Sequence, residues 1–418
     1  MTPEGAMARG STRSMLALVA MIVFLDIAGI GLIVPVMPRL IISLTGVTID
    51  RAAELGGWLL FAYAVMQFLF APVIGGLSDR FGRRPVLLLT LFALGIDYAL
   101  MAWAPTLEWL FVGRIISGVM GATFAAANSC IADIVPPEDR GRAFGAIGGV
   151  GAAGFVLGPG IGGLLGGFGE RVPFMAASGL ALGGALIGWF VLQETLPPER
   201  RRAFSMLRAN PIGSMVHMAK VPLVLGCLVA ILFMQLAAQS QLAVWSFQGI
   251  ARFGWSPLVI GLTIASYGVL LIGAQGFAVG PLVTRFGAPR VAVVGAACGI
   301  PSYLILATAP NTGIIMIGMV IGACTGVAFP AMQQLMTLRV SEDAQGELQG
   351  AIASVASLTA IVGPPLMTGV FGAYADAQGM YFPGAPFLLS AMLFGVGWAV
   401  LIIAMARNRD EAVVPDRP

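Results

Sequence analysis

Long apolar runs follow one another along almost the whole chain, separated by short polar or Pro- and Gly-containing segments. About 20 helical residues cross the roughly 30 Å hydrocarbon core of a bilayer. The pattern therefore predicts an all-α integral membrane protein with twelve transmembrane helices. The expected ranges are 15–37, 54–76, 85–104, 107–128, 143–167, 172–193, 220–246, 257–280, 289–309, 312–337, 346–372 and 384–406.

Composition agrees with the pattern. Of the 418 residues, 58% are hydrophobic and only 10% are charged, whereas about a quarter of the residues in a soluble domain are charged. No stretch alternates apolar and polar residues over strand lengths, which argues against an outer-membrane barrel. The first apolar run is too long for the core of a signal peptide and lacks a cleavage site after it, so we expect it to be the first transmembrane helix.

Positive charges lie mostly on one side of the predicted spans. Assigning successive loops to alternate sides puts 18 Lys and Arg residues on the side of both termini and 4 on the other. The positive-inside rule then places both termini and the central loop in the cytoplasm, which requires an even number of spans.

The chain repeats itself at a constant offset of 205 residues. The matched pairs include Gly75 and Gly280, Arg80 and Arg285, Gly82 and Gly287, Gly121 and Gly326, Gly145 and Gly350, and Pro159 and Pro364. Six spans fall in each repeat, so the two halves have the same orientation. This predicts two six-helix bundles, 1–193 and 220–418, related by a pseudo-two-fold axis along the membrane normal, with a substrate cavity between them.

The segment 194–219 is the predicted cytoplasmic linker. It contains a basic run, Arg200 to Arg202, and apolar residues that could face the membrane surface: Met206, Leu207, Met215 and Met218. An interfacial helix and a solvated tether are both compatible with this composition.

Three ionisable residues fall inside predicted spans, all in the first half: Asp26, Asp97 and Arg114. Charges at membrane depth are costly and commonly mark ion or substrate pathways. A low dielectric favours the neutral form of a carboxyl group, whereas an arginine stays charged. Competition among a proton, a substrate and Arg114 for either aspartate would couple two fluxes. A static buried ion pair is the alternative.

Neutral amides and aromatic rings are the candidate lining of a substrate cavity, since such groups suit a bulky, partly apolar ligand. The alternative is that each amide forms hydrogen bonds between helices. The candidates are Gln67, Asn128, Gln235, Gln239, Trp245, Phe247, Gln275 and Gln333.

The loop GGLSDRFGRRP, between the second and third spans, is short and highly charged. Topology alone accounts for its arginines but not for Asp79, so we expect a latch between helix ends in which Gly82 permits a tight turn. Asp133, Glu138, Asp139, Arg140 and Arg142 in the next cytoplasmic loop are possible partners. The candidate latch residues are Asp79, Arg80, Gly82, Arg83, Arg84, Asp133 and Arg140.

Several chemistries find no support in the sequence. The only histidine is His217 and there is no P-loop, so a Ser-His-Asp hydrolase and direct ATP drive are both excluded. A GxGxxG at Gly149 to Gly154 lies in a predicted span with no preceding strand, which argues against a nucleotide site. No metal-ligand spacing occurs, and the four cysteines fall in apolar runs, as small buried hydrophobes do. We expect no cofactor and no nucleic-acid partner.

The motifs resemble those of the major facilitator superfamily. GGLSDRFGRRP looks like the loop signature of this superfamily. VGRIISG looks like the helix 4 motif of the superfamily's drug/proton antiporters. GFVLGPGIGG resembles the antiporter motif, which implies that Gly154, Gly158, Pro159 and Gly162 bend helix 5 and seal the halves together. FLDIAGIGLIVPVMP, GIDYALMAWAP and QGELQGAIASVASLTAIVGPP are similar to the tetracycline/proton antiporters.

This resemblance implies roles for particular residues. Asp26, Asp97 and Arg114 fall on that family's essential intramembrane charges, Asp79 and Arg83 on its gating-loop charges, and Gln239 and Trp245 on its helix 7 pattern. Two positions depart from it: Leu271 replaces the helix 8 histidine and Gly299 the helix 9 aspartate. These departures leave open whether tetracycline, which would arrive as a divalent-metal chelate, is the substrate, and which route the proton takes.

The expected function is secondary active efflux of a hydrophobic or amphipathic drug in exchange for protons, by alternating access. We expect a monomer in the bacterial inner membrane, partnered by lipid, protons and a small-molecule drug. A proton-coupled metabolite symporter is an alternative within transport, and the preference for efflux over uptake rests mainly on GFVLGPGIGG. A non-transporting sensor or lipid-handling protein belongs to another class, and a sensor would be expected to carry a sizeable soluble domain.

Overall fold

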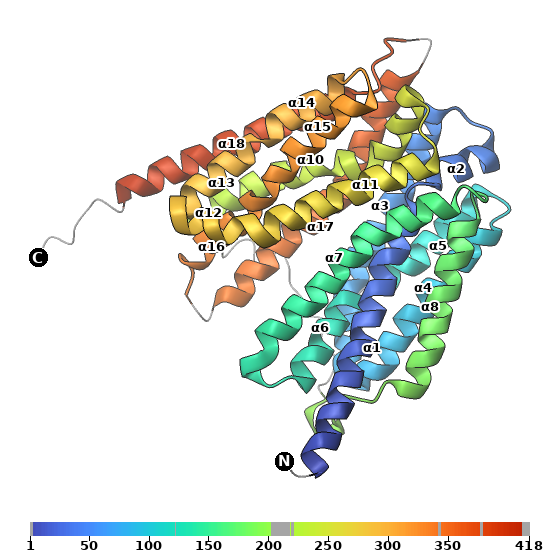
Figure 1. The fold of residues 1–418 in the computed structure, drawn as a ribbon, viewed down its shortest axis with the longest axis vertical. Coiled ribbons are helices and arrows are strands. Elements are labelled where there is room, and N and C mark those ends of the chain that lie inside the picture. The colour runs from blue at the N-terminus through green and yellow to red at the C-terminus, as the bar shows by residue number, and fades with distance from the viewer. Residues whose placement is uncertain are drawn as a thin grey trace, which may run out of the picture. The chain divides into compact units, whose positions relative to one another are not determined.

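A computed structural model describes residues 3–121, 123–201, 218, 221–341, 344–376 and 379–411. Every regular element in these ranges is helical (Figure 1). Most of the predicted linker, including Met206, Leu207 and Met215, lies outside the described residues. Met218 is described and buried.

The chain forms two compact units. Unit 1 comprises 1–47, 62–209 and 255–265, and unit 2 comprises 48–61, 210–254 and 266–418. Each half therefore contributes the first turns of one helix to the other half's unit: 48–61 joins unit 2, and 255–265 joins unit 1.

Besides the start of α11 (Pro257–Gly273), unit 1 contains all or most of eight described α-helices. They are α1 (Pro3–Ile33), α2 (Met37–Thr45), most of α3 (Ile49–Phe81), α4 (Arg83–Trp103), α5 (Leu107–Val119), α6 (Thr123–Ile134), α7 (Arg140–Leu165) and α8 (Val172–Val191). The 3-10 turns η1 (Pro137–Asp139) and η2 (Pro198–Arg200) follow α6 and α8. The short α2, which begins at the Met37-Pro38 dipeptide, lies beyond the first predicted span.

Unit 2 contains the remaining described helices. They are α10 (Pro222–Phe253), the second part of α11 (Pro257–Gly273), η4 (Ala274–Ala278), α12 (Val279–Phe286), α13 (Ala288–Ala297), α14 (Gly299–Thr308), α15 (Thr312–Ala323), η5 (Cys324–Val327), α16 (Ala328–Thr337), α17 (Gln345–Ala375) and α18 (Ala385–Glu411). Figure 1 shows α10, α14, α15 and α18 running alongside one another within this unit.

Eleven described helices are long and apolar enough to cross a membrane. The one predicted span not among these eleven is the fourth in the chain, 107–128. It corresponds to α5 and α6, which are separated after Val119 and are each too short alone to cross a membrane. The same break recurs 205 residues later, where the 3-10 turn η5 separates α15 from α16. Gly82 and Gly287, another pair at this offset, both have positive φ, at 106° and 80°. The backbone thus carries the internal repeat that the sequence predicts.

Candidate functional site

The predicted intramembrane arginine and one aspartate form a buried ion pair within unit 1. Arg114 Nη2 on α5 donates to Asp97 Oδ2 on α4 at 2.5 Å. The two side chains are 7% and 0% exposed. A Cβ at position 113 would collide with Asp97 Oδ1, so the glycine in VGRIISG provides the space for the aspartate. Deleting one partner of such a pair leaves an uncompensated buried charge.

The pair retains hydrogen-bonding capacity. Within the described residues, Asp97 Oδ1 and Arg114 Nε are buried with no hydrogen-bond partner. The guanidinium instead lies 5.7 Å from the centre of the Tyr63 ring, a cation–π contact with α3. The Asp97 oxygen without a partner is the one left for a proton or a substrate donor.

Asp26 lies on α1 in the same unit and is half-buried. Its side-chain hydrogen-bond partner is Thr123, at the start of α6, and no described cation forms an ion pair with it. Tyr63 is close enough to interact electrostatically with all three predicted charges, and so is Tyr98 on α4. The fold therefore gathers Asp26, Asp97 and Arg114 around two tyrosines and a threonine that sequence reasoning missed, because such residues are common in apolar spans.

Arg83 is the centre of the predicted latch. Its Nη1 lies 2.6 Å from Asp79 Oδ1 at the end of α3, and its Nε lies 3.1 Å from Asp133 Oδ2 on α6. The same guanidinium donates to Ser78 Oγ at 3.2 Å. The predicted partnership between Asp79, Arg83 and Asp133 is thus present, and it joins the ends of three helices.

A third carboxylate, which the sequence did not reveal, completes this cluster. Glu194, after α8, accepts hydrogen bonds from the backbone N–H groups of Arg83, Thr195 and Leu196. Gly82 has φ 106° and ψ 163°, and a Cβ there would collide with the Glu194 carboxylate. Only glycine fits this turn without strain.

The other predicted latch residues have different partners. Arg84 Nη2 donates to the Trp189 carbonyl at 2.6 Å, and Arg140 donates to the carbonyls of Ala132 and Val135 near the end of α6. Arg80 lies over the ring of Phe81, at 5.2 Å. Among the described residues, none of these three arginines forms an ion pair.

Trp245 and Phe247 on α10 do not fit the predicted cavity lining. Each is only 4% exposed. The Trp245 ring lies 6.1 Å from Phe387, and the Phe247 ring lies 6.4 Å from Phe371. Hydropathy alone cannot distinguish a ring that lines a cavity from one that packs in a core, and here both rings belong to the core of unit 2.

Two of the candidate amides bond to protein groups, as the alternative interpretation allowed. Gln67 Nε2 donates to the Gly121 carbonyl at 2.7 Å, at the α5–α6 break, and contacts Tyr63 Oη at 3.1 Å. Gln333 Nε2 donates to Gln349 Oε1 at 3.3 Å. Gln67 therefore connects the α5–α6 break to the tyrosine beside Arg114.

The remaining amides are less constrained. Asn128 and Gln235 are half-buried. Gln275 is exposed and lies in η4, a π-helical turn; such turns occur often at functional sites. Gln239 is half-buried, and its Oε1 is buried without a hydrogen-bond partner among the described residues.

The glycine-rich part of α7 packs directly on two other backbones within unit 1. A Cβ at Gly158 would lie 2.6 Å from the Ala28 carbonyl of α1, and Gly154 and Gly162 face the same helix. On the other side, Gly163 meets the Pro257 carbonyl at the start of α11. Pro159 lies inside α7. Side chains at these glycines would hold the helices apart.

The two departures from the antiporter pattern lie in packed surroundings in unit 2. Gly299 is buried against the Phe394 ring, which occupies the space that a side chain at this position would need. Leu271 is half-buried beside Gly326. Neither position could take up a proton. In the described part of the chain, no group of three His, Cys, Asp or Glu side chains could hold a metal ion.

The family model described as Major Facilitator Superfamily matches residues 16–248 and 244–416. The chain belongs to the major facilitator superfamily. It is a multi-pass membrane transporter, not an enzyme, and the predicted fold class is confirmed.

Among curated proteins, the chain is 41% identical to the class C tetracycline resistance protein of Escherichia coli, covering 89% of this chain and 92% of that protein. It is 38% identical to the class G tetracycline resistance protein of Vibrio anguillarum, covering 87% and 92%. This major facilitator protein therefore also belongs to the tetracycline resistance protein family, as the quoted motifs indicated.

Solved structures confirm the fold. A bacterial homologue of the human lysosomal transporter Spinster, in an inward-facing and occupied conformation, has a TM-score of 0.77 at 18% identity, covering 94% of this chain and 96% of that chain. A D-xylose–proton symporter has a TM-score of 0.71 at 16% identity, covering 93% and 96%. Since these proteins differ in function, the fold itself does not fix the substrate.

Proposed function

We propose that this transporter exports an amphipathic drug of the tetracycline type across the bacterial inner membrane in exchange for protons. The observation that carries the proposal is the cluster of Asp26, Asp97 and Arg114 in unit 1. The kinship with tetracycline resistance proteins supports a drug as the substrate. The positive-inside rule places both termini in the cytoplasm.

Asp26 is the proposed proton carrier. Its carboxyl group hydrogen-bonds to a neutral hydroxyl, Thr123, and no described cation holds it in the charged state. It can therefore exchange a proton for another positive or hydrogen-bonding group. Asp97 is compensated on one oxygen by Arg114, and its other oxygen remains available. We assign Asp97 and Arg114 to the coupling between proton and drug occupancy.

Competition between the proton and the drug for Asp26 is enough to couple their movements. A protonated Asp26 would disfavour a cationic or hydrogen-bond-donating drug, and a deprotonated Asp26 would favour it. If the transporter switches between its two access states only when either a proton or a drug is bound, each crossing of one must be followed by a return crossing of the other. The two are then exchanged. The buried environment of Gly299 supports a proton route confined to the first half, because unit 2 has no carboxyl group at that position.

Efflux is the direction that the relatives favour, and metabolite symport is the alternative, since a proton symporter shares the fold.

In an efflux-deficient bacterium, expression should raise the minimal inhibitory concentration of tetracycline at least fourfold. The vector and an Asp26→Asn chain at equal expression are the controls. Unchanged susceptibility to tetracyclines and to a panel of amphipathic drugs would argue against drug export.

The latch makes a second prediction for this transporter. Arg83→Gln removes contacts to Asp79, Asp133 and Ser78 at once, so the helix ends lose their common partner. We expect drug transport to fall at least tenfold. Arg80→Gln is the matched variant in the same loop, because Arg80 lies over the Phe81 ring and forms no ion pair within the described residues. Its loss of transport should be under twofold. Equal transport by the two variants would contradict the central role of Arg83.

A further inference from the structure

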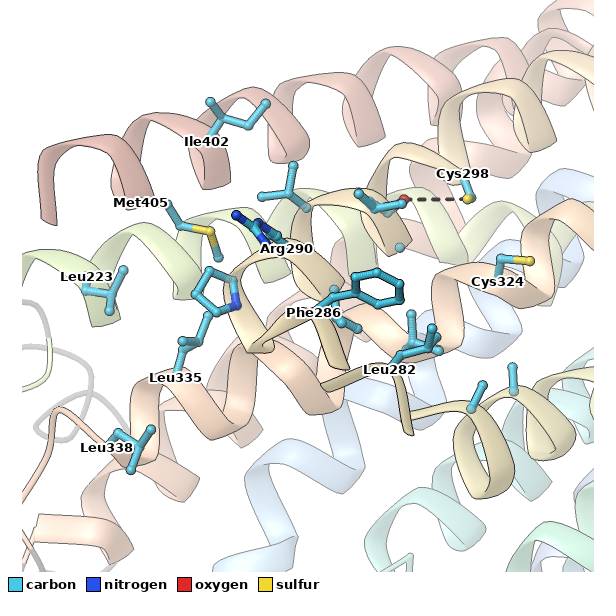
Figure 2. Close-up of a pocket in the computed structure, with 18 of the residues that line it drawn as sticks. Leu223, Leu282, Phe286, Arg290, Cys298, Cys324, Leu335, Leu338, Ile402 and Met405 are labelled. Carbon is cyan, nitrogen blue, oxygen red and sulfur yellow. Dashed lines mark hydrogen bonds between the residues drawn. The ribbon is translucent and has the colours of Figure 1, made fainter. Parts of the chain in front are cut away.

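An apolar cavity of about 1380 Å³ lies within unit 2. Its walls come from η4, α12, α13, η5, α16 and α18, with one residue from the first turn of α10 (Figure 2). Typical small-molecule pockets measure roughly 300–1,000 Å³, so this cavity has room for a ligand larger than a drug.

The lining has a simple chemistry. Apart from two cysteine thiols, its only polar side chains are Arg290 and Arg339, and no lining residue is acidic. Neither arginine forms an ion pair with a described carboxylate. Arg290 lies in the first turn of α13 and Arg339 follows α16, so both are at one end of the cavity. The thiols of Cys298 and Cys324 lie farther along, and eight residues of α13 correspond to about 12 Å.

The cavity is also open to the outside of the unit. Phe286 is 45% exposed, Val294 66% and Leu338 74%. Figure 2 shows Arg290 between Met405 and Phe286, with Cys298 and Cys324 beyond Phe286 on the right of the view. Exposed apolar patches of this kind are typical of surfaces that contact membrane or other apolar partners.

We propose that this cavity binds an anionic phospholipid from the cytoplasmic leaflet. Its phosphate would lie on Arg290 and Arg339, which the positive-inside rule places at the cytoplasmic surface, and an acyl chain would fill the apolar part toward Cys324. A polyhydroxylated drug fits less well, because the walls offer almost no hydrogen-bonding groups to replace its lost hydration. This proposal does not depend on the exported substrate.

The native cysteines provide a test. Cys324 is exposed and Cys298 half-buried, whereas Cys130 and Cys227 are buried and would react only on unfolding. The full-length chain is placed in nanodiscs of phosphatidylcholine, with or without phosphatidylglycerol. Alkylation of each cysteine by a membrane-permeant maleimide is followed by mass spectrometry. Phosphatidylglycerol should slow alkylation of Cys324 at least threefold.

The variants separate charge from general membrane effects. The double variant Arg290→Gln/Arg339→Gln should lose the protection, and Arg290→Lys/Arg339→Lys should keep it. Arg201→Gln, an exposed arginine of the linker, should behave like the wild type. Reaction at Cys130 or Cys227 identifies a variant that has not folded. If the glutamine double variant fails in this way, protection in the lysine double variant still tests whether positive charge at the two positions is sufficient.

Three results would overturn the proposal. The first is equal alkylation with and without phosphatidylglycerol. The second is equal protection by inorganic phosphate in phosphatidylcholine discs, which would indicate an anion site without a lipid chain. The third is protection by tetracycline in those discs, which would make the cavity a drug site.

Discussion

Asp26→Asn should abolish proton-driven drug accumulation in proteoliposomes while leaving drug–drug counterflow largely intact. Asparagine has nearly the shape of aspartate and can still hydrogen-bond to Thr123, but it cannot take up or release a proton. Loss of coupling without loss of the transport cycle is therefore the specific expectation, with uphill accumulation falling at least tenfold.

Counterflow makes this prediction selective. A variant that misfolds loses both activities, whereas an uncoupled transporter loses only the uphill one. Glu108→Gln, at the exposed start of α5, is the matched control for removing a carboxylate and should change neither activity. If Asp26→Asn retained full proton-driven accumulation, the proton would have to use another group.

Arg114→Gln should have the largest effect on stability. The change removes the charge opposite Asp97 Oδ2 and leaves a fully buried carboxylate uncompensated. Breaking a buried pair in this way typically costs about 3–5 kcal/mol. We expect a marked fall in the unfolding temperature in detergent, measured by tryptophan fluorescence, together with loss of transport.

The double variant Asp97→Asn/Arg114→Gln distinguishes a structural pair from a functional one. Two neutral amides remove both buried charges, so most of the lost stability should return. Transport should not return if the pair couples proton and drug occupancy. A double variant that transports normally would show the pair to be a static structural element.

Hydropathy and the internal repeat predicted most of the helices, because a membrane span needs a long apolar run that few other structures require. The break between α5 and α6 was not predicted, because its residues are as apolar as those of a continuous helix. Composition also could not predict that two helix starts belong to the unit of the other half, namely 48–61 and 255–265. That assignment depends on which helix backbones approach each other.

For the site, charge in an apolar span was a strong signal, and Asp26, Asp97 and Arg114 were found for that reason. Glu194 was missed because it lies far along the chain in a polar segment, where an acid is unremarkable. Trp245 and Phe247 were assigned to the cavity, but they pack in the core of unit 2, since an aromatic side chain suits either place.

Drug-driven proton movement tests the central claim most directly. Proteoliposomes containing the wild-type chain and a trapped pH-sensitive dye, with no initial pH gradient, receive an outside pulse of tetracycline. Antiport predicts a change in internal pH that is absent in protein-free and Asp26→Asn vesicles. Tetracycline uptake with no pH change in wild-type vesicles would contradict proton exchange, and no uptake of any amphipathic drug tested would contradict drug transport itself.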